Sequence, residues 1–296
     1  MKKKSLFSTV ALTLLFLLLL QGSCVKNNPL PVYLEISEWT LNANPVLNGK
    51  EGDLFHGIKH AAVYVGDEIL GYFELPCKIP VLKSGNTRIT ISPAIMNGGR
   101  MTVKTVYPFT DYYYEDLNLE EGKTYHIEPV TRYNSSVEFA FVEDFESASL
   151  KIMTDPTSTA SLFQTQHTDP GKSGYKGIIN LSASDTLWLG NTFSDLVLPK
   201  GGKPVFLEID YRNTAYVSTG MISINSSNEN TIHPNVGLNA QDASAAVWKK
   251  IYIELTEIVS YSTDSQYFEL YFKTSLPADF TEAKVEIDNI KIVHLK

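Results

Sequence analysis

The feature that most constrains the fold is a series of short segments in which apolar and polar residues alternate. In Val32–Ile36, three aliphatic residues alternate with Tyr33 and Glu35, which is the period of a strand with one buried face. No stretch between Pro31 and Ser136 sustains the 3.6-residue apolar period of a helix. Turn residues such as Gly66-Asp67 separate the segments. The pattern predicts an all-β chain built from antiparallel sheets.

The alternating segments form two series, divided by a polar break at Asn134–Ser136. Before the break, we expect strands at Pro31–Ile36, Ala61–Val65, Ile69–Leu75, Thr87–Ser92, Met101–Tyr107 and Thr124–Pro129. Alternation restarts at Phe139–Phe145, and further strands are expected at Ser149–Thr154, Gly177–Leu181, Thr186–Leu189, Pro204–Arg212, Gly220–Asn225, Trp248–Leu255, Tyr267–Thr274 and Lys284–Leu295. Ser226–Ala243 is expected to be a long polar loop. The sequence therefore predicts two β-sandwich domains, residues 31–136 and 137–296.

The first residues have the pattern of an export signal. Lysines at 2–4 precede an apolar run, Leu6–Leu20, and the small-residue segment Gln21–Ser23 then leads to Cys24. The run is short for a membrane span. A cysteine at this place predicts a lipoprotein, with signal 1–23, acylated Cys24 and tether 24–30. We expect the protein to be held in the cell envelope by the lipid bilayer, most simply at the outer membrane, with its leaflet undetermined.

Charge and cysteine content narrow the possible partners. The chain has 25 Lys+Arg against 33 Asp+Glu, a net charge of -8, and losing the signal lysines makes it more acidic. An acidic surface disfavours nucleic acid as a partner. With Cys24 acylated, Cys77 stands alone, so packed cores and not disulfides must stabilise the fold. Its apolar neighbours predict a buried, inert thiol.

One segment of the first series is similar to a known kind of β-domain. Val63–Pro76 followed by Ile79–Gly85 runs strand, Gly-Asp turn, strand, Leu-Pro bend, strand and Ser-Gly turn. It resembles the PEGA and immunoglobulin-like β-domains of bacterial surface proteins. The match covers turn and core positions only, so it implies a fold and no ligand.

The second series resembles jelly-roll carbohydrate-binding modules and their galactose-binding-like relatives. The matching phrases are Asp144-Phe145-Glu146, Gly171–Gly174, Phe206–Tyr211, Trp248–Ile253 and Val285–Ile292. In such modules the acid after the opening Phe, an early-loop carbonyl and an aspartate of the last strand often hold calcium. The resemblance therefore implies a structural calcium at Glu146, the backbone around 171–174, and Asp288, whose oxygens suit a hard cation.

Aromatic residues are the candidate ligand-binding groups. Tyr112-Tyr113-Tyr114 could form a sugar-stacking platform, but only alternate residues of a strand share a face, so at least one should pack inward. In the second series, Trp188, Tyr211, Tyr216 and Trp248 are further candidates, most of them expected in the core. The binding residues we propose at this point are Trp188, Tyr211, Tyr216 and Tyr113.

No catalytic signature such as Gly-x-Ser-x-Gly or His-Glu-x-x-His occurs in the sequence. Carboxylate pairs such as Asp264 with Glu269 are expected by chance among so many acids, so we do not expect an enzyme. The leading hypothesis is a non-catalytic envelope lipoprotein whose jelly roll binds glycan. The alternative is a structural or assembly lipoprotein that contacts protein partners of an envelope complex. Exposed aromatics on a sheet face would favour glycan, and a large flat apolar patch would favour protein.

Overall fold

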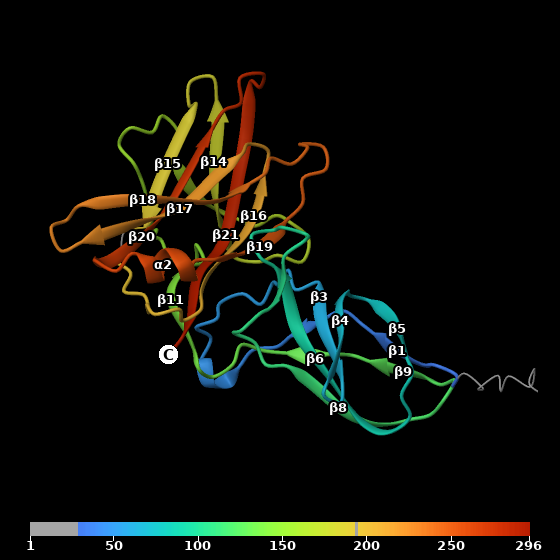
Figure 1. Cartoon of the computed structure of the whole chain (residues 1–296). Helices are drawn as coiled ribbons and strands as arrows, with labels where there is room; N and C mark the ends of the chain where they lie inside the picture. Colours follow the sequence, from blue (N-terminus) through green and yellow to red (C-terminus); the bar gives the residue numbers. More distant parts are fainter. Residues whose placement is uncertain (1–28, 193–194) are drawn as a thin grey trace, which may run out of the picture.

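The computed structural model describes residues 29–192 and 195–296, and this part of the chain is all-β (Figure 1). Apart from strands it contains the 3-10 turn η1 (Pro45–Leu47) and one short helix, α2 (Thr256–Tyr261). Within these ranges no helix is long and apolar enough to cross a membrane. The expected signal, Cys24 and most of the tether lie outside the described residues, so they stay predictions.

Residues 31–136, the N-terminal unit, form a sandwich around a core that includes Val32, Leu34, Ile36, Val63 and Ile91. One layer has the order β4-β3-β6-β7, with β8 also paired to β6. The facing layer is β5-β1-β9, in which β1 and β9 run parallel, and a small parallel pair joins β2 to β10. The strands are β1 (Val32–Ile36), β2 (Thr40–Leu41), β3 (His60–Val65), β4 (Glu68–Glu74), β5 (Cys77–Val81), β6 (Gly85–Met96), β7 (Lys104–Val106), β8 (Tyr113–Leu119), β9 (Thr124–Ile127) and β10 (Val130–Thr131).

Residues 137–296, the C-terminal unit, form a jelly roll of two antiparallel sheets. Strand β21 is the long central element of one sheet, β13-β14-β21-β16-β19, and β11 pairs with its second half. The other sheet has the order β12-β15-β20-β17-β18. The strands are β11 (Val137–Glu143), β12 (Ile152–Thr154), β13 (Leu162–Gln166), β14 (Tyr175–Ser182), β15 (Leu187–Thr192), β16 (Val205–Asn213), β17 (Val217–Asn225), β18 (Asn230–Leu238), β19 (Lys249–Glu254), β20 (Ser265–Ser275) and β21 (Glu282–Leu295).

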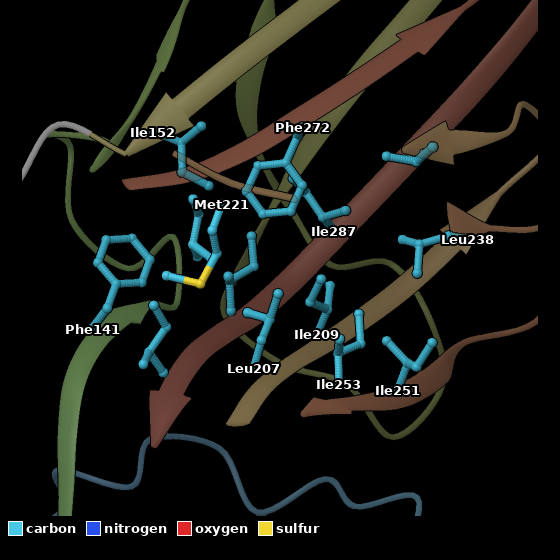
Figure 2. Close-up of a cluster of buried hydrophobic side chains, with 14 of the residues drawn as sticks. Phe141, Ile152, Leu207, Ile209, Met221, Leu238, Ile251, Ile253, Phe272 and Ile287 are labelled. Carbon is cyan, nitrogen blue, oxygen red and sulfur yellow. The ribbon is translucent and has the colours of Figure 1, made fainter. Parts of the chain in front are cut away.

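The two sheets of the C-terminal unit enclose an apolar core (Figure 2). Leu207 and Ile209 point from β16 into this core, where they meet Met221 and Phe272 of the opposite sheet. Because alternate residues of a strand face opposite ways, their neighbours Glu208 and Asp210 must lie on the outer face of the six-stranded sheet. Both are nevertheless completely buried, which shows that another layer covers that face.

The covering layer is the N-terminal unit. Its core cluster takes in Phe206, Tyr252 and Val293 from the outer face of the C-terminal sheet. The Tyr107 ring lies 5.7 Å from Phe206 and 4.9 Å from Tyr252, between ring centroids. The two units therefore share one continuous apolar contact.

Several sequence-based assignments were wrong. Strands β8 and β13 were not among those expected, and the Cys77 thiol, predicted to be buried, is only half-buried. Ser226–Ala243 is not only a loop, because β18 lies within it and forms the edge of its sheet, despite Pro234. An edge strand tolerates a proline because one side of its backbone has no partner. The expected strand Met101–Tyr107 shortens to β7, and the turn residues before it continue as turn.

Candidate functional site

The outer face of the six-stranded sheet carries a layer of buried charges, which we call the charged layer. Strand β16 contributes Glu208, Asp210 and Arg212 at alternate positions. Neighbouring strands contribute the facing charges Lys250 from β19, and Glu286, Asp288 and Lys291 from β21. The alternation that buries Leu207 and Ile209 in the core thus produces this layer.

Glu208 is the acid of the charged layer that binds tyrosines of the N-terminal unit. Its carboxylate accepts hydrogen bonds from the hydroxyls of Tyr107 and Tyr133, the latter at 2.8 Å, and pairs with the Lys250 Nζ at 3.0 Å. Burial alone would raise the pKa of Glu208, but the charges of Lys250 and Lys291, together with the tyrosine hydrogen bonds, outweigh burial, so the pKa is lowered. Glu208 is therefore ionised inside the protein, and both units contribute to holding its charge.

A second group of charges surrounds Trp248. Asp169 accepts from the Trp248 indole N–H at 3.1 Å and pairs with Lys176 at 3.0 Å and Arg212 at 2.6 Å. Lys176 and Arg212 also form ion pairs with Glu286. Burial opposes ionisation of Asp169, but its three partners hold the pKa well below the usual range. Each acid in this group is thus already neutralised by a base.

Three carboxylates, Asp53, Asp210 and Asp288, lie close enough together to hold a cation. The Lys172 ammonium lies 3.3 Å from Asp210 and 3.9 Å from Asp53, so it supplies positive charge there. Burial raises the pKa of Asp288 to about 6, although it contacts the buried His167 ring at 3.0 Å.

The expected calcium ligands take different positions. Asp288 belongs to the three-carboxylate cluster, whereas Glu146 is not a member and accepts the backbone N–H of Tyr175 at 2.7 Å. Gly174 lies against the Glu146 side chain. The structure therefore does not group Glu146 with Asp288, and the calcium site stays a prediction.

A strap from the N-terminal unit, residues 51–57, crosses the charged layer. Lys291 donates to the carbonyl oxygens of Glu51 and Asp53, the latter at 2.9 Å. The Lys172 ammonium lies 3.9 Å from the centroid of the Phe55 ring, and the Gly57 N–H donates to the Tyr252 hydroxyl at 3.2 Å. The strap closes this part of the jelly-roll face to a large ligand.

Lys291 should make the stability of the protein depend on pH. Burial, and then the nearby Lys250 charge, lower the pKa of Lys291 to about 8, whereas an unfolded lysine titrates at about 10.4. Between these values the unfolded chain binds more protons, so stability rises with pH. From about pH 8 to about pH 10.5, we expect the unfolding free energy to rise by about 2–3 kcal/mol relative to Lys291→Met. Urea titrations at a series of pH values test this, and parallel profiles would contradict it.

Beyond the strap, the same sheet face opens into a cleft of about 660 Å³. Its walls include Asn180, Thr214, Lys284 and the two acids Glu282 and Glu286. Glu286 is bound by Lys176 and Arg212, so it is not a free partner for acid–base catalysis with Glu282. The cleft offers polar groups, and no aromatic ring of the described residues, 29–192 and 195–296, lines it.

The outer face of the N-terminal sheet is different, because tyrosine rings are exposed on it. Along one row the register places Tyr72, Ala62 and Ser92 on the successive strands β4, β3 and β6, and Tyr112 directly precedes β8, which pairs with β6. In the next row Tyr64, Thr90 and Tyr114 follow one another. We call this surface the tyrosine face; its rings are Tyr64, Tyr72, Tyr112 and Tyr114.

The smaller residues Ala62, Ser92 and Thr90 lie between the rings of the tyrosine face. Tyr72, Tyr112 and Tyr114 are 40%, 62% and 53% exposed, whereas Ala62 has no exposed surface. Strands β4 and β8 are three strand spacings apart, about 14 Å. The face is thus a shallow platform with rings at its sides.

The ring of Tyr114 is held in place by its neighbours. The Arg88 guanidinium lies 4.7 Å from the ring centroid and forms two hydrogen bonds with Asp116, at 2.9 and 2.8 Å. The Tyr112 ring centroid is 6.2 Å from that of Tyr114. Because Arg88 is paired with Asp116, it adds no net charge to the tyrosine face.

The structure separates the four aromatic residues that the sequence singled out. Trp188 is 1% exposed and stacks on Phe272 in the core, where no ligand reaches it. Tyr211 packs against the same core, and Tyr216 is 50% exposed beside Gly237. Tyr113 packs against the N-terminal core, as expected for one member of the triplet. The structure does not bring these four together, and sequence reasoning missed Tyr64 and Tyr72, which only strand register places beside Tyr112 and Tyr114.

No family model matches the chain, and no curated protein matches it. Among solved structures, the enzymatically active domain of bacteriophage CBA120 tailspike protein 4 is 12% identical over 52% of this chain and 20% of its own, with a TM-score of 0.40. CBM22-1–GH10 modules of a Clostridium thermocellum xylanase are 11% identical over 53% and 28%, with a TM-score of 0.39. The CBM22-1 xylan-binding domain of Paenibacillus barcinonensis Xyn10C is 11% identical over 54% and 97%, also at 0.39. Each likeness covers about half of this chain.

Proposed function

We propose that this protein is a non-catalytic glycan-binding protein of the cell envelope, and that the tyrosine face binds the glycan. The observation that carries the proposal is the set of exposed rings on one open sheet face, with hydroxyl-bearing residues Ser92 and Thr90 between them. The electron-rich face of an aromatic ring attracts the C–H groups of a sugar ring, and hydroxyls of the protein can bond those of the sugar.

The buried charges argue against the jelly-roll face as the main glycan surface. The charged layer is closed by the strap and by Tyr107 and Tyr133. The residues that the structure describes along the cleft beside it include no ring to stack on a sugar. The glycan site is therefore assigned to the N-terminal unit, not to the C-terminal unit that the sequence favoured.

The expected lipid anchor is compatible with this arrangement. The chain enters the N-terminal unit through β1, whose start lies at the end away from the C-terminal unit (Figure 1). There Pro31 accepts a hydrogen bond from Gly122, in the turn between β8 and β9. Acylation of Cys24 would hold this end at the outer membrane and direct the C-terminal unit away from the bilayer.

Removal of single rings from the tyrosine face should weaken binding to polysaccharide. We expect Tyr72→Ala and Tyr114→Ala each to raise the Kd about three- to tenfold, the usual value of an aromatic contact. Affinity electrophoresis of the whole chain through gels containing xylan, mixed-linkage β-glucan or starch measures this.

Tyr261→Ala is the matched control for these variants, because Tyr261 is 80% exposed but lies on α2 in the other unit. It should migrate like the wild type in every gel. If none of the polysaccharides retards the wild type, or if Tyr261→Ala weakens binding as much as Tyr72→Ala, the proposed function is wrong.

A further inference from the structure

A groove of about 440 Å³ opens beside Tyr112, at the edge of the tyrosine face. It is lined by Val130 and Thr131 of β10, by Asn42 and Pro45 from the segment after β2, and by Tyr112. The volume is within the range of small-molecule sites. Tyr112 therefore belongs to two surfaces, the open platform and this groove.

An ion pair of the N-terminal unit lies in the groove. The Arg132 Nε donates to the Asp111 Oδ2 at 3.0 Å, with the two side chains 52% and 42% exposed. Backbone contacts fix both residues: the Asp111 N–H donates to the Arg132 carbonyl oxygen at 2.9 Å, and the Thr131 hydroxyl donates to the Asp111 carbonyl oxygen. The two charged groups are thus held side by side before any ligand binds.

This pair has spare hydrogen-bonding capacity. A guanidinium has five N–H donors and a carboxylate has about four acceptor positions, and the Asp111–Arg132 contact uses one of each. The pair has no net charge, so it does not select for an ionic ligand. A donor and an acceptor at neighbouring positions match two adjacent hydroxyls of a sugar, one of which accepts while the other donates.

We propose that the groove is a subsite for one sugar residue of the same glycan, a neutral sugar with two adjacent free hydroxyls. This proposal rests on the function proposed above. One hydroxyl donates to Asp111, the neighbouring hydroxyl accepts from Arg132, and the C–H face of the sugar lies against Tyr112. The glycan chain continues from the groove over Tyr114 and across the sheet towards Tyr72. The groove sets which sugar is accepted, and the tyrosine face adds affinity along the chain.

Two substitutions in the whole chain test this subsite. Asp111→Ala and Arg132→Ala should each raise the Kd about tenfold for the polysaccharide that retards the wild type, because each loses a hydrogen bond to a charged group. The matched control is the exposed pair Glu120 and Lys123, joined at 2.7 Å in the β8–β9 turn with side chains 54% and 58% exposed. Glu120→Ala and Lys123→Ala should leave the Kd unchanged.

The outcomes separate the subsite from the proposed function. If Tyr72→Ala and Tyr114→Ala weaken binding while Asp111→Ala and Arg132→Ala do not, the tyrosine face binds glycan and the subsite is wrong. If Glu120→Ala and Lys123→Ala weaken binding as much as Asp111→Ala and Arg132→Ala do, the effect is not local to the groove, and the proposed subsite is again wrong. If no polysaccharide binds the wild type, the function fails and the subsite fails with it.

Discussion

Replacing Glu208 by alanine should lower the free energy of unfolding by about 3–5 kcal/mol, the usual cost of removing one partner from a buried ion pair. Glu208 has no exposed surface, and its carboxylate is the acceptor for Tyr107 and Tyr133 and the partner of Lys250. Its loss leaves the Lys250 ammonium with Asp210 alone and leaves two buried hydroxyls without their acceptor. Equilibrium urea unfolding measures the change.

Two further variants show whether the charge or the hydrogen bonds matter. Glu208→Gln keeps an acceptor for the tyrosines but removes the charge, so its loss of stability should be smaller than that of Glu208→Ala. Glu282→Ala removes an exposed acid at the start of β21 and should change stability by no more than about 0.5 kcal/mol. A Glu208→Ala variant as stable as Glu282→Ala would show that the charged layer contributes nothing to the fold.

The strands of this protein were largely predictable, because apolar alternation is a local signal. Pro204–Arg212 was expected as a strand and is β16, Val205–Asn213. The same alternation predicted that one residue of Tyr112–Tyr114 packs inward, and Tyr113 does. Strand β18 was missed because its polar residues and Pro234 resemble a loop. Local patterns thus give strands, except where an edge strand is polar.

The candidate site depends on register between strands, which the sequence does not state. Tyr72 and Tyr114 are 42 positions apart in the chain and share one sheet face only because β4, β3, β6 and β8 pair as they do. The charged layer has the same origin. From the alternation within its strand, Glu208 would be predicted to lie on an exposed face. The residues next to it in sequence do not indicate that Tyr107 and Tyr133 will cover it. The available signal was the set of complementary charges at alternate positions of β16, β19 and β21. This pattern predicts that the charges pair with one another, but it does not show which part of the chain covers them.

The shared core gives the last expected result, for residues 137–296 expressed alone. This fragment keeps the complete jelly-roll core around Leu207, Met221 and Phe272, so it should fold and melt cooperatively. It loses the N-terminal cover of Phe206 and Val293, which are 3% and 0% exposed in the whole chain. Exposing two such side chains costs about 3–6 kcal/mol, a large part of the roughly 5–15 kcal/mol that stabilises a domain.

The fragment should therefore melt well below the C-terminal unit in the whole chain, as followed by calorimetry and circular dichroism. Adding separately expressed residues 31–136 is the control, because a partner that binds only the folded state must raise the melting temperature as its concentration increases. An unfolded fragment would show that the boundary near Asn134–Ser136 does not separate two folding units. A fragment that melts at the temperature of the whole chain would show instead that the cover over Phe206, Tyr252 and Val293 adds no stability, and that the two units only touch.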